Sequence, residues 1–203
     1  FNANTGEEVM GYIPEGIFNK LSILTDTTYD HAFFVDGVLA AGDVFINGGW
    51  KTVLIGSLGR GGNTIFAIDV TDMTSFDETK ILWEFTHPEL GVVLGKPQIV
   101  RLLNGKWSIV IGNGYNSSSE KPELFIIDIE TGNLTKKITA GNETFAGNNG
   151  LSTPLVVDTN GDFISDLIYA GDLKGNLWKF NLNSSSVDSV SYTHLTLPTI
   201  PQV

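Results

Sequence analysis

One nine-residue stretch, residues 158–166 (DTNGDFISD), carries the side chains whose types and spacing are best suited to chemistry. Side-chain oxygens stand at its first, third, fifth and ninth positions, and the seventh position supplies a backbone carbonyl. A tight loop turns such groups toward one centre, where they approach the roughly six to eight oxygen ligands that calcium takes at about 2.3–2.6 Å. Magnesium suits this set less well because it requires octahedral geometry and gives up water reluctantly. The pattern predicts a Ca²⁺ site formed by Asp158, Asn160, Asp162, the carbonyl of Ile164, and Asp166.

The sixth position of this loop departs from the usual calcium-loop pattern, which has glycine where the backbone turns sharply. Phe163 stands there, and Gly161 comes two residues earlier. A bulky residue held at positive φ costs on the order of 1–2 kcal/mol. We therefore expect either a different bend or weaker calcium binding. The alternative interpretation is a metal-free turn whose Asp and Asn side chains cap backbone amides.

Composition limits the classes of protein to which the chain can belong. With 203 residues, 41% of them hydrophobic and 17% charged, it can form one globular domain with a sizeable core. The 23 acidic residues outnumber the 12 basic ones and give a net charge of −11, which argues against nucleic acid as a partner. The absence of cysteine excludes disulfides and thiolate sites. No apolar run reaches the ~18 residues that a transmembrane helix needs.

The two ends of the chain differ from its middle. The sequence begins at Phe1 within a pattern and shows no signal peptide, so we expect residues 1–189 to be an N-terminally truncated β-propeller fragment. Residues 190–203 do not continue the preceding pattern. Back-translated, they resemble the transposase end and adapter used in DNA library preparation. We expect them to be a translated sequencing adapter and not native protein, with no function for His194.

Short apolar runs recur along the chain in a fixed order, which is the basis for predicting the fold. A first run is followed by a second that ends in glycine, and by a third in which an acid or amide precedes a turn. Asp69, Asp128 and Asn181 mark the third run at spacings of 59 and 53 residues. The first runs are Ala32–Val35, Gln98–Leu102 and Leu155–Val157; the second are Thr52–Gly56, Ser108–Gly112 and Leu167–Gly171; the third are Phe1–Gly6, Ile65–Thr71, Phe125–Gly132 and Trp178–Asn183; a further run follows at Ile81–Phe85 and Leu134–Ile138.

Several short strands in each period, without helical periodicity, are typical of propeller blades. We predict an all-β, quinoprotein-like β-propeller with about three blades plus part of a fourth. A closed ring needs roughly four to eight blades, so we expect this chain to form part of a larger one. The stretch Ile13–Tyr29 is expected to contain a short helix within a loop, because Phe18, Leu21 and Leu24 recur at helical spacing. The alternative fold is an all-β sandwich.

Tryptophan recurs with the predicted strands, at positions 50, 83, 107 and 178. Large aromatic rings contribute much of the buried surface of a protein core. We therefore predict that Trp50, Trp83, Trp107 and Trp178 pack between blades. The alternative is that these rings form a docking site for a ligand.

A series of specific motifs follows one order along the chain: 48–56 (GGWKTVLIG), 65–71 (IFAIDVT), 90–97 (LGVVLGKP), 103–107 (LNGKW), 111–117 (IGNGYNS), 149–154 (NGLSTP) and 169–180 (YAGDLKGNLWKF). This series resembles the C-terminal β-propeller of the PilC/PilY group of type IV pilus assembly and tip proteins. The resemblance covers residues 1 to about 183. The ordered series is much more specific than any single motif in it.

The resemblance implies a large bacterial protein that is extracellular or associated with the outer membrane, at the pilus tip. Such a protein regulates pilus extension and retraction and supports adhesion or twitching motility. Its partners would be pilus subunits or minor pilins, and host-surface ligands reached through regions outside this chain. Calcium held by the acidic loop would regulate that role, with the ligand set already predicted. The resemblance implies no enzyme activity.

Two other classes of propeller stay open at this point. A quinone-dependent dehydrogenase is also a tryptophan-rich propeller with glycine-rich turns, but the chain has neither an adjacent-cysteine pair nor an evident catalytic base. An integrin-like ligand-binding propeller repeats its calcium loop in several blades. This chain shows such a loop once.

Overall fold

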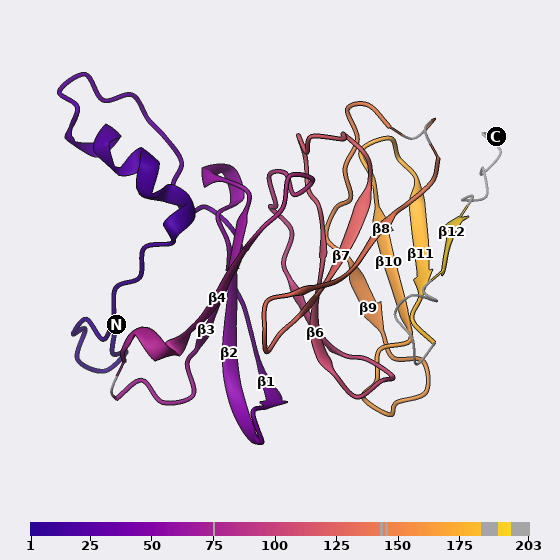
Figure 1. Ribbon diagram of the computed structural model, residues 1–203, viewed down its shortest axis with the longest axis horizontal. Helices are drawn as coiled ribbons and strands as arrows, with labels where there is room; N and C mark the ends of the chain where they lie inside the picture. The colour runs from indigo at the N-terminus through magenta and orange to yellow at the C-terminus, as the bar shows by residue number, and fades with distance from the viewer. Residues whose placement is uncertain (75, 143, 145, 184–190, 196–203) are drawn as a thin grey trace, which may run out of the picture.

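A computed structural model describes residues 1–74, 76–142, 144, 146–183 and 191–195. In these residues the chain forms three four-stranded antiparallel sheets, each a meander in which neighbours in sequence pair (Figure 1). The first sheet comprises β1 (Ala40–Ile46), β2 (Gly49–Ser57), β3 (Thr64–Asp69) and β4 (Ile81–Thr86). The second comprises β5 (Gln98–Arg101), β6 (Trp107–Gly112), β7 (Glu123–Asp128) and β8 (Leu134–Thr139). The third comprises β9 (Leu155–Val157), β10 (Leu167–Gly171), β11 (Leu177–Asn181) and β12 (Ser191–Leu195).

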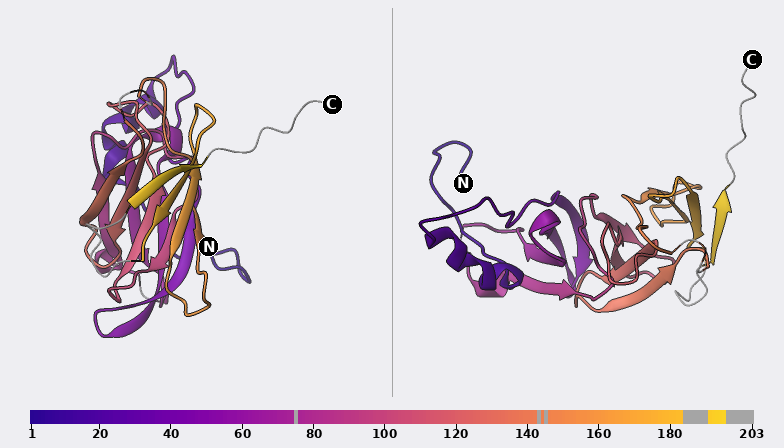
Figure 2. Two further views of the ribbon diagram at one scale, coloured as in Figure 1. Left: turned by 90° about the vertical axis from the view of Figure 1, so that its right-hand side faces the viewer. Right: turned by 90° about the horizontal axis from the view of Figure 1, so that it is seen from above.

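The three sheets stand side by side in chain order, and from above they follow an arc (Figure 2). The first strand of each sheet lies next to that of the following sheet, since β1 contacts β5 and β5 contacts β9. This is the arrangement of consecutive propeller blades. The predicted all-β propeller with about three blades is therefore confirmed.

The core lies between the blades, and the middle blade is buried on both faces. Along β6, Ile109 and Ile111 pack with the first blade, whereas Val110 packs with the third. Along β7, Phe125 packs with the first blade and Leu124 packs with the third. Because side chains alternate between the faces of a strand, a strand buried on both sides must be apolar throughout. This explains why the predicted strands read as unbroken apolar runs.

One turn recurs at the end of the third strand of every blade. The side chains of Asp69, Asp128 and Asn181 each accept a hydrogen bond from the amide two residues further on, at 3.0, 3.1 and 2.9 Å. Asn2 makes the same bond to the amide of Asn4, at 2.9 Å. Phe1–Gly6 thus forms the turn of the repeat without a strand. The predicted unit of strand and turn is confirmed in three copies, and the copy at Phe1–Gly6 has the turn alone.

The segment before the first blade contains the 3₁₀ helix η1 (Glu15–Thr25), which lies within the stretch predicted to hold a short helix. Two shorter 3₁₀ helices follow, η2 (Gly59–Gly61) and η3 (Glu78–Lys80). The predicted strand Ala32–Val35 is wrong, since the first strand of this blade is β1. Among the residues described, no helix is long and apolar enough to cross a membrane.

The last strand involves residues whose native origin we question. β12 pairs with β11, with His194 opposite Trp178. Pairing at a sheet edge does not test where residues 190–203 come from, so the adapter origin stays a prediction. Residues 184–190 and 196–203 lie outside the described part of the chain.

Candidate functional site

The acidic loop joins β9 to β10, the first two strands of the third blade. Leu167 pairs with Val157 across this loop, as Val53 pairs with Gly42 and Ser108 with Val100 in the other blades. Leu167, Val53 and Ser108 in turn face the three recurring turn residues Asn181, Asp69 and Asp128. The loop therefore occupies the place of the hairpin turns that connect β1 to β2 and β5 to β6.

Asp158 organises the backbone of the loop. Its Oδ1 accepts hydrogen bonds from the amides of Asn160, at 3.2 Å, and Gly161, at 2.7 Å. Its Oδ2 accepts one from the amide of Phe163, at 2.8 Å. Burial opposes ionisation of this carboxyl, but these amide hydrogen bonds outweigh it and hold its pKa below the ordinary value. Asp158 is thus a carboxylate around which the loop closes.

Asn160 and Asp162 extend this arrangement. The Oδ1 of Asn160 accepts from the amide of Asp162 at 3.0 Å, and its Nδ2 donates to Asp162 Oδ2 at 3.2 Å. Asp162 Oδ1 accepts from the amide of Ile164 at 2.8 Å. Each of the predicted ligands at positions one, three and five thus accepts a hydrogen bond from the amide of the next ligand in the series, within one exposed turn.

Asp166 lies apart from this exposed group, at the base of the loop. Its side chain is buried, and Oδ2 accepts hydrogen bonds from both the amide and the hydroxyl of Thr159. Its own amide donates to the carbonyl of Val157 at 3.0 Å, and its carbonyl accepts from the amide of Leu182 at 2.8 Å. Asp166 closes the loop upon the sheet.

Phe163 adopts the left-handed conformation, with φ of 63°, and its side chain is 86% exposed. The loop therefore makes its sharp turn at the sixth position, where the calcium-loop pattern has glycine. Of the two alternatives expected for Phe163, the different bend is therefore wrong, and positive φ at this side chain costs on the order of 1–2 kcal/mol.

The loop's oxygens suit a hard cation, although the described residues hold no preassembled cluster of charged ligands. No three His, Cys, Asp or Glu side chains among the described residues come together as a metal-binding group. An ionised carboxylate has about four lone-pair sites, of which Asp158 uses at least three and Asp162 two, so free acceptor capacity lies mainly on Asp162. An amide oxygen and a backbone carbonyl complete a set of the type that calcium binds. The five predicted ligands stay a prediction.

The four tryptophans have different environments, which the sequence did not indicate. The indole N–H groups of Trp83 and Trp178 donate to Ile129 O and Asp172 Oδ2, at 2.9 and 3.0 Å. Trp178 is fully buried, and Trp83 and Trp107 pack against the core. Trp50 is 64% exposed, so the prediction that it packs between blades is wrong. Trp50 lies close to the β1–β2 turn, in the part of β2 that pairs with β1 but not with β3, which explains this exposure.

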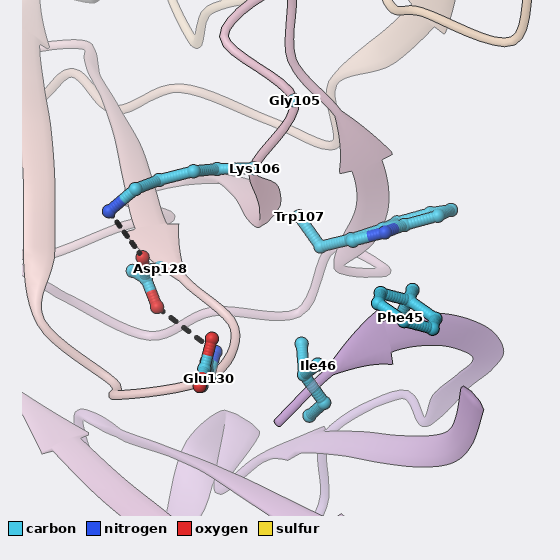
Figure 3. Close-up of a pocket in the computed structure, with 7 residues that line it drawn as sticks. All are labelled: Phe45, Ile46, Gly105, Lys106, Trp107, Asp128 and Glu130. Carbon is cyan, nitrogen blue, oxygen red and sulfur yellow. Dashed lines mark hydrogen bonds and ion pairs between the residues drawn. The ribbon is translucent and has the colours of Figure 1, made fainter. Parts of the chain in front are cut away.

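Trp50 instead belongs to a groove beside the hairpin turns of the first two blades, whose first hollow is drawn in Figure 3. Its ring meets those of Phe45 and Trp107 edge to face, at 5.8 and 6.1 Å between centroids. Lys106 and Asp128 form an ion pair of 3.4 Å on the other side of this hollow. The sequence signal for the groove was the motif LNGKW at 103–107, which places a tryptophan next to a tight turn.

A second cluster that sequence analysis missed joins the first blade to the second. Lys137 Nζ lies 2.5 Å from Glu89 Oε2 and 3.0 Å from Glu123 Oε1. Burial, followed by the neighbouring carboxyl of Glu89, raises the pKa of Glu123 to about 7 despite Lys137. Hydrogen bonding to Glu123 and then to Lys137 lowers the pKa of Glu89. The two carboxyl groups thus lie on either side of one ammonium group, with Glu123 the one that is easier to protonate.

Comparison with known proteins gives one consistent result. The family model of the PilY1 beta-propeller domain matches residues 5–194. The chain is 45% identical over 188 residues to the type IV pilus biogenesis factor PilY1 of Pseudomonas aeruginosa strain UCBPP-PA14, which covers 90% of this chain and 16% of that protein. It is 41% identical over 189 residues to a PilY1 homolog of Xylella fastidiosa, covering 88% and 13% of the two chains.

A solved structure agrees with these matches. The crystal structure of the Pseudomonas aeruginosa PilY1 C-terminal domain superposes with a TM-score of 0.74 at 43% identity, over 87% of this chain and 35% of that one. The chain thus spans about a sixth or less of the full relatives and about a third of the solved domain. With the family model matched along nearly its whole length, the chain belongs to the PilY1 beta-propeller domain family.

Proposed function

We propose that this chain is the calcium-binding part of the propeller of a type IV pilus biogenesis factor. In this role it regulates pilus extension and retraction, and supports adhesion or twitching motility, from an extracellular or outer-membrane-associated position at the pilus tip. Pilus subunits or minor pilins are the partners that fit such a role. The relatives are named as type IV pilus biogenesis factors, which supports the general role.

The observation that carries the calcium proposal is the conformation of Phe163. A bulky, exposed residue is held at positive φ where a calcium loop needs its sharp turn. Backbone strain of this kind persists where the surrounding structure enforces it, and it clusters at functional sites. Here the Asp158 carboxylate enforces it through the amide of Phe163.

The residues that would hold the ion are Asp158, Asn160, Asp162, the carbonyl of Ile164, and Asp166. A calcium ion supplies positive charge that offsets the repulsion between carboxylates in one loop. In the absence of metal, amide hydrogen bonds from Phe163 and Ile164 hold the carboxylates of Asp158 and Asp162. A ligand shifts a conformational equilibrium only by its difference in affinity for the two states. The strength of regulation is therefore set by how much better the ordered loop binds calcium.

Calcium titration of the chain and of Asp162→Ala tests the site. We expect calcium to raise the melting temperature and change the tryptophan fluorescence of the wild type, with no response in the variant. Asp26→Ala is the matched control, because Asp26 caps the amide of Thr28 in an exposed turn of the same kind. A retained calcium response in Asp162→Ala, or a wild type that stays folded without responding, would contradict the proposal.

The pilus role has its own test, in a bacterium whose type IV pili depend on a protein containing this chain. The full-length protein carrying Asp162→Ala should assemble pili but lose the calcium dependence of twitching motility. Unchanged calcium dependence in the variant would separate the metal site from pilus regulation. Loss of motility in the Asp26→Ala control would show that the effect is not specific to the loop.

A further inference from the structure

We propose that the groove beside the hairpin turns of the first two blades is a binding site for a neutral saccharide. The groove is defined by Phe45, Trp50, Arg101, Lys106, Trp107, Asp128 and Glu130. It is independent of the calcium proposal, since none of the acidic loop's side chains lines it.

The groove consists of two adjoining hollows of about 160 and 210 Å³. Both are lined by Phe45, Gly105 and Trp107, so the aromatic rings stand where the hollows meet. Together the hollows fall in the lower part of the range of about 300–1,000 Å³ that is typical of small-ligand sites. Gly105 has φ of 82° and lines both hollows from the β5–β6 turn without a side chain.

Part of the aromatic surface of the groove is exposed to solvent and is not packed in the core. Phe45 is 50% exposed and Trp50 is 64% exposed. Whereas the indole N–H groups of Trp83 and Trp178 are hydrogen-bonded inside the protein, those of Trp50 and Trp107 have no acceptor among the described residues. Exposed aromatic surface gathered around a concavity marks an interaction site. An indole offers a ligand both an apolar face and a hydrogen-bond donor.

The charges around the rings favour a ligand without net charge. Arg101 and Lys106 supply two cationic groups, and Asp128 and Glu130 supply two anionic ones. An anionic ligand would meet the two carboxylates and a protein of net charge −11, and a cation would meet the two basic groups. A sugar ring has an apolar C–H face that can lie on an aromatic ring, and hydroxyls that both donate and accept. The groove offers partners for each of these features.

The groove offers a ligand side chains more than free backbone. Phe45 pairs with Trp50, and Arg101 pairs with Trp107, so each wall strand is already paired on one side. A peptide that adds to a sheet needs an unpaired strand edge, and the outer edges of β1 and β5 lie next to each other where the two blades meet. Recognition in the groove is therefore expected to depend on its side chains.

Titration with neutral hexasaccharides tests the proposal, with maltohexaose, cellohexaose, chitohexaose and laminarihexaose as probes. We expect at least one to bind, as measured by calorimetry and by a change in tryptophan fluorescence. The Trp50→Ala variant should bind about tenfold or more weakly, since a buried aromatic anchor typically contributes more than the energy of a tenfold change in affinity. Trp50→Phe, which keeps an aromatic face, should retain most of the affinity.

Phe18→Ala is the matched control, because Phe18 is 56% exposed and lies on η1, away from the groove. It should bind the saccharide as the wild type does, and all variants should keep the wild-type melting temperature within about 2 °C. Absence of binding by all four saccharides at millimolar concentration would overturn the proposal. So would equal binding by Trp50→Ala, or binding of a proline-rich peptide at Trp50 in place of every saccharide.

Discussion

The backbone amide of Ser165 donates a hydrogen bond of 2.9 Å to the carbonyl of Arg101. Ser165 belongs to the acidic loop of the third blade, whereas Arg101 ends the first strand of the second blade. Arg101 also pairs with Trp107, whose ring lines the groove. The base of the acidic loop is therefore fastened to the neighbouring blade, beside the groove.

Substitution of Phe163 tests the strain in the acidic loop. Phe163→Gly removes the cost of positive φ and should raise the free energy of unfolding by up to about 1 kcal/mol, after the greater flexibility of glycine in the unfolded chain is included. It should also tighten calcium binding. Phe163→Val places a β-branched residue at positive φ and should lower stability by a further ~1 kcal/mol. Chemical denaturation with and without calcium measures both effects, and equal stability of the two variants would refute the strain.

The cluster around Glu123 predicts a pH dependence of stability. The folded-state pKa of Glu123 is raised from 4.5 to about 7, so between these values the folded protein keeps a proton that the unfolded chain has lost. This contribution to stability is complete below pH 4.5 and is lost as the pH rises through 7. As a carboxylate, Glu123 would leave its buried Oε2 without a donor among the described residues. As an acid, it can donate toward Glu89.

Glu123→Gln provides the measurement for this dependence. The amide resembles the protonated acid, so the variant should lose the decline in melting temperature between pH 4.5 and 7. Glu78→Gln is the control, because Glu78 is exposed on η3 and should leave the decline unchanged. The same slope in wild type and Glu123→Gln would show that another group titrates.

Trp178 and Trp50 should differ sharply when each is replaced by alanine. Trp178 is 1% exposed and bonds Asp172, so Trp178→Ala should cost about 3–5 kcal/mol of unfolding free energy. Trp50 is 64% exposed, so Trp50→Ala should change stability by less than about 0.5 kcal/mol. Urea denaturation of the two variants checks the contrast. Comparable losses would mean that Trp50 is covered in the folded protein.

Asn113 connects three parts of the chain and should be sensitive to truncation. Its buried side chain donates to Lys121 O at 2.8 Å and accepts from the amides of Glu123 and Leu151, at 3.1 and 2.9 Å. Asn113→Ala leaves these buried groups without their partner, at about 1–3 kcal/mol for each unsatisfied group. Exposed Asn183 is the control position, where alanine should cost little. A loss below about 1 kcal/mol for Asn113→Ala would contradict this role.

The sequence was most informative where turn residues bound a short apolar run. The predicted Leu155–Val157 and Leu167–Gly171 coincide with β9 and β10, because Pro154 and Asp158 flank the first run, and Asp166 and a terminal glycine bound the second. The β1 strand was missed because Gly42 and Asp43 interrupt its apolar pattern. What makes it a strand is its long pairing with β2, which a local pattern does not contain.

The side-chain environments of the site were less predictable. The acidic loop was found because its ligand types follow a fixed local spacing. The Glu123 cluster was missed because Glu89 and Lys137 come from distant segments, although a glutamate opening an apolar strand was a visible signal. Trp50 was misassigned because the residue type does not show whether a tryptophan in a hairpin packs in the core or stays exposed near the turn.

The acidic loop begins and ends at the same ladder positions of its sheet as the shorter turns of the other blades. Val157 and Leu167 occupy the same ladder positions as Val100 and Ser108, which are joined by a shorter connection. Exchange of this one connection for a shorter one would therefore leave the ladder positions beneath it as they are, at the loss of the hydrogen bond from Ser165 to Arg101.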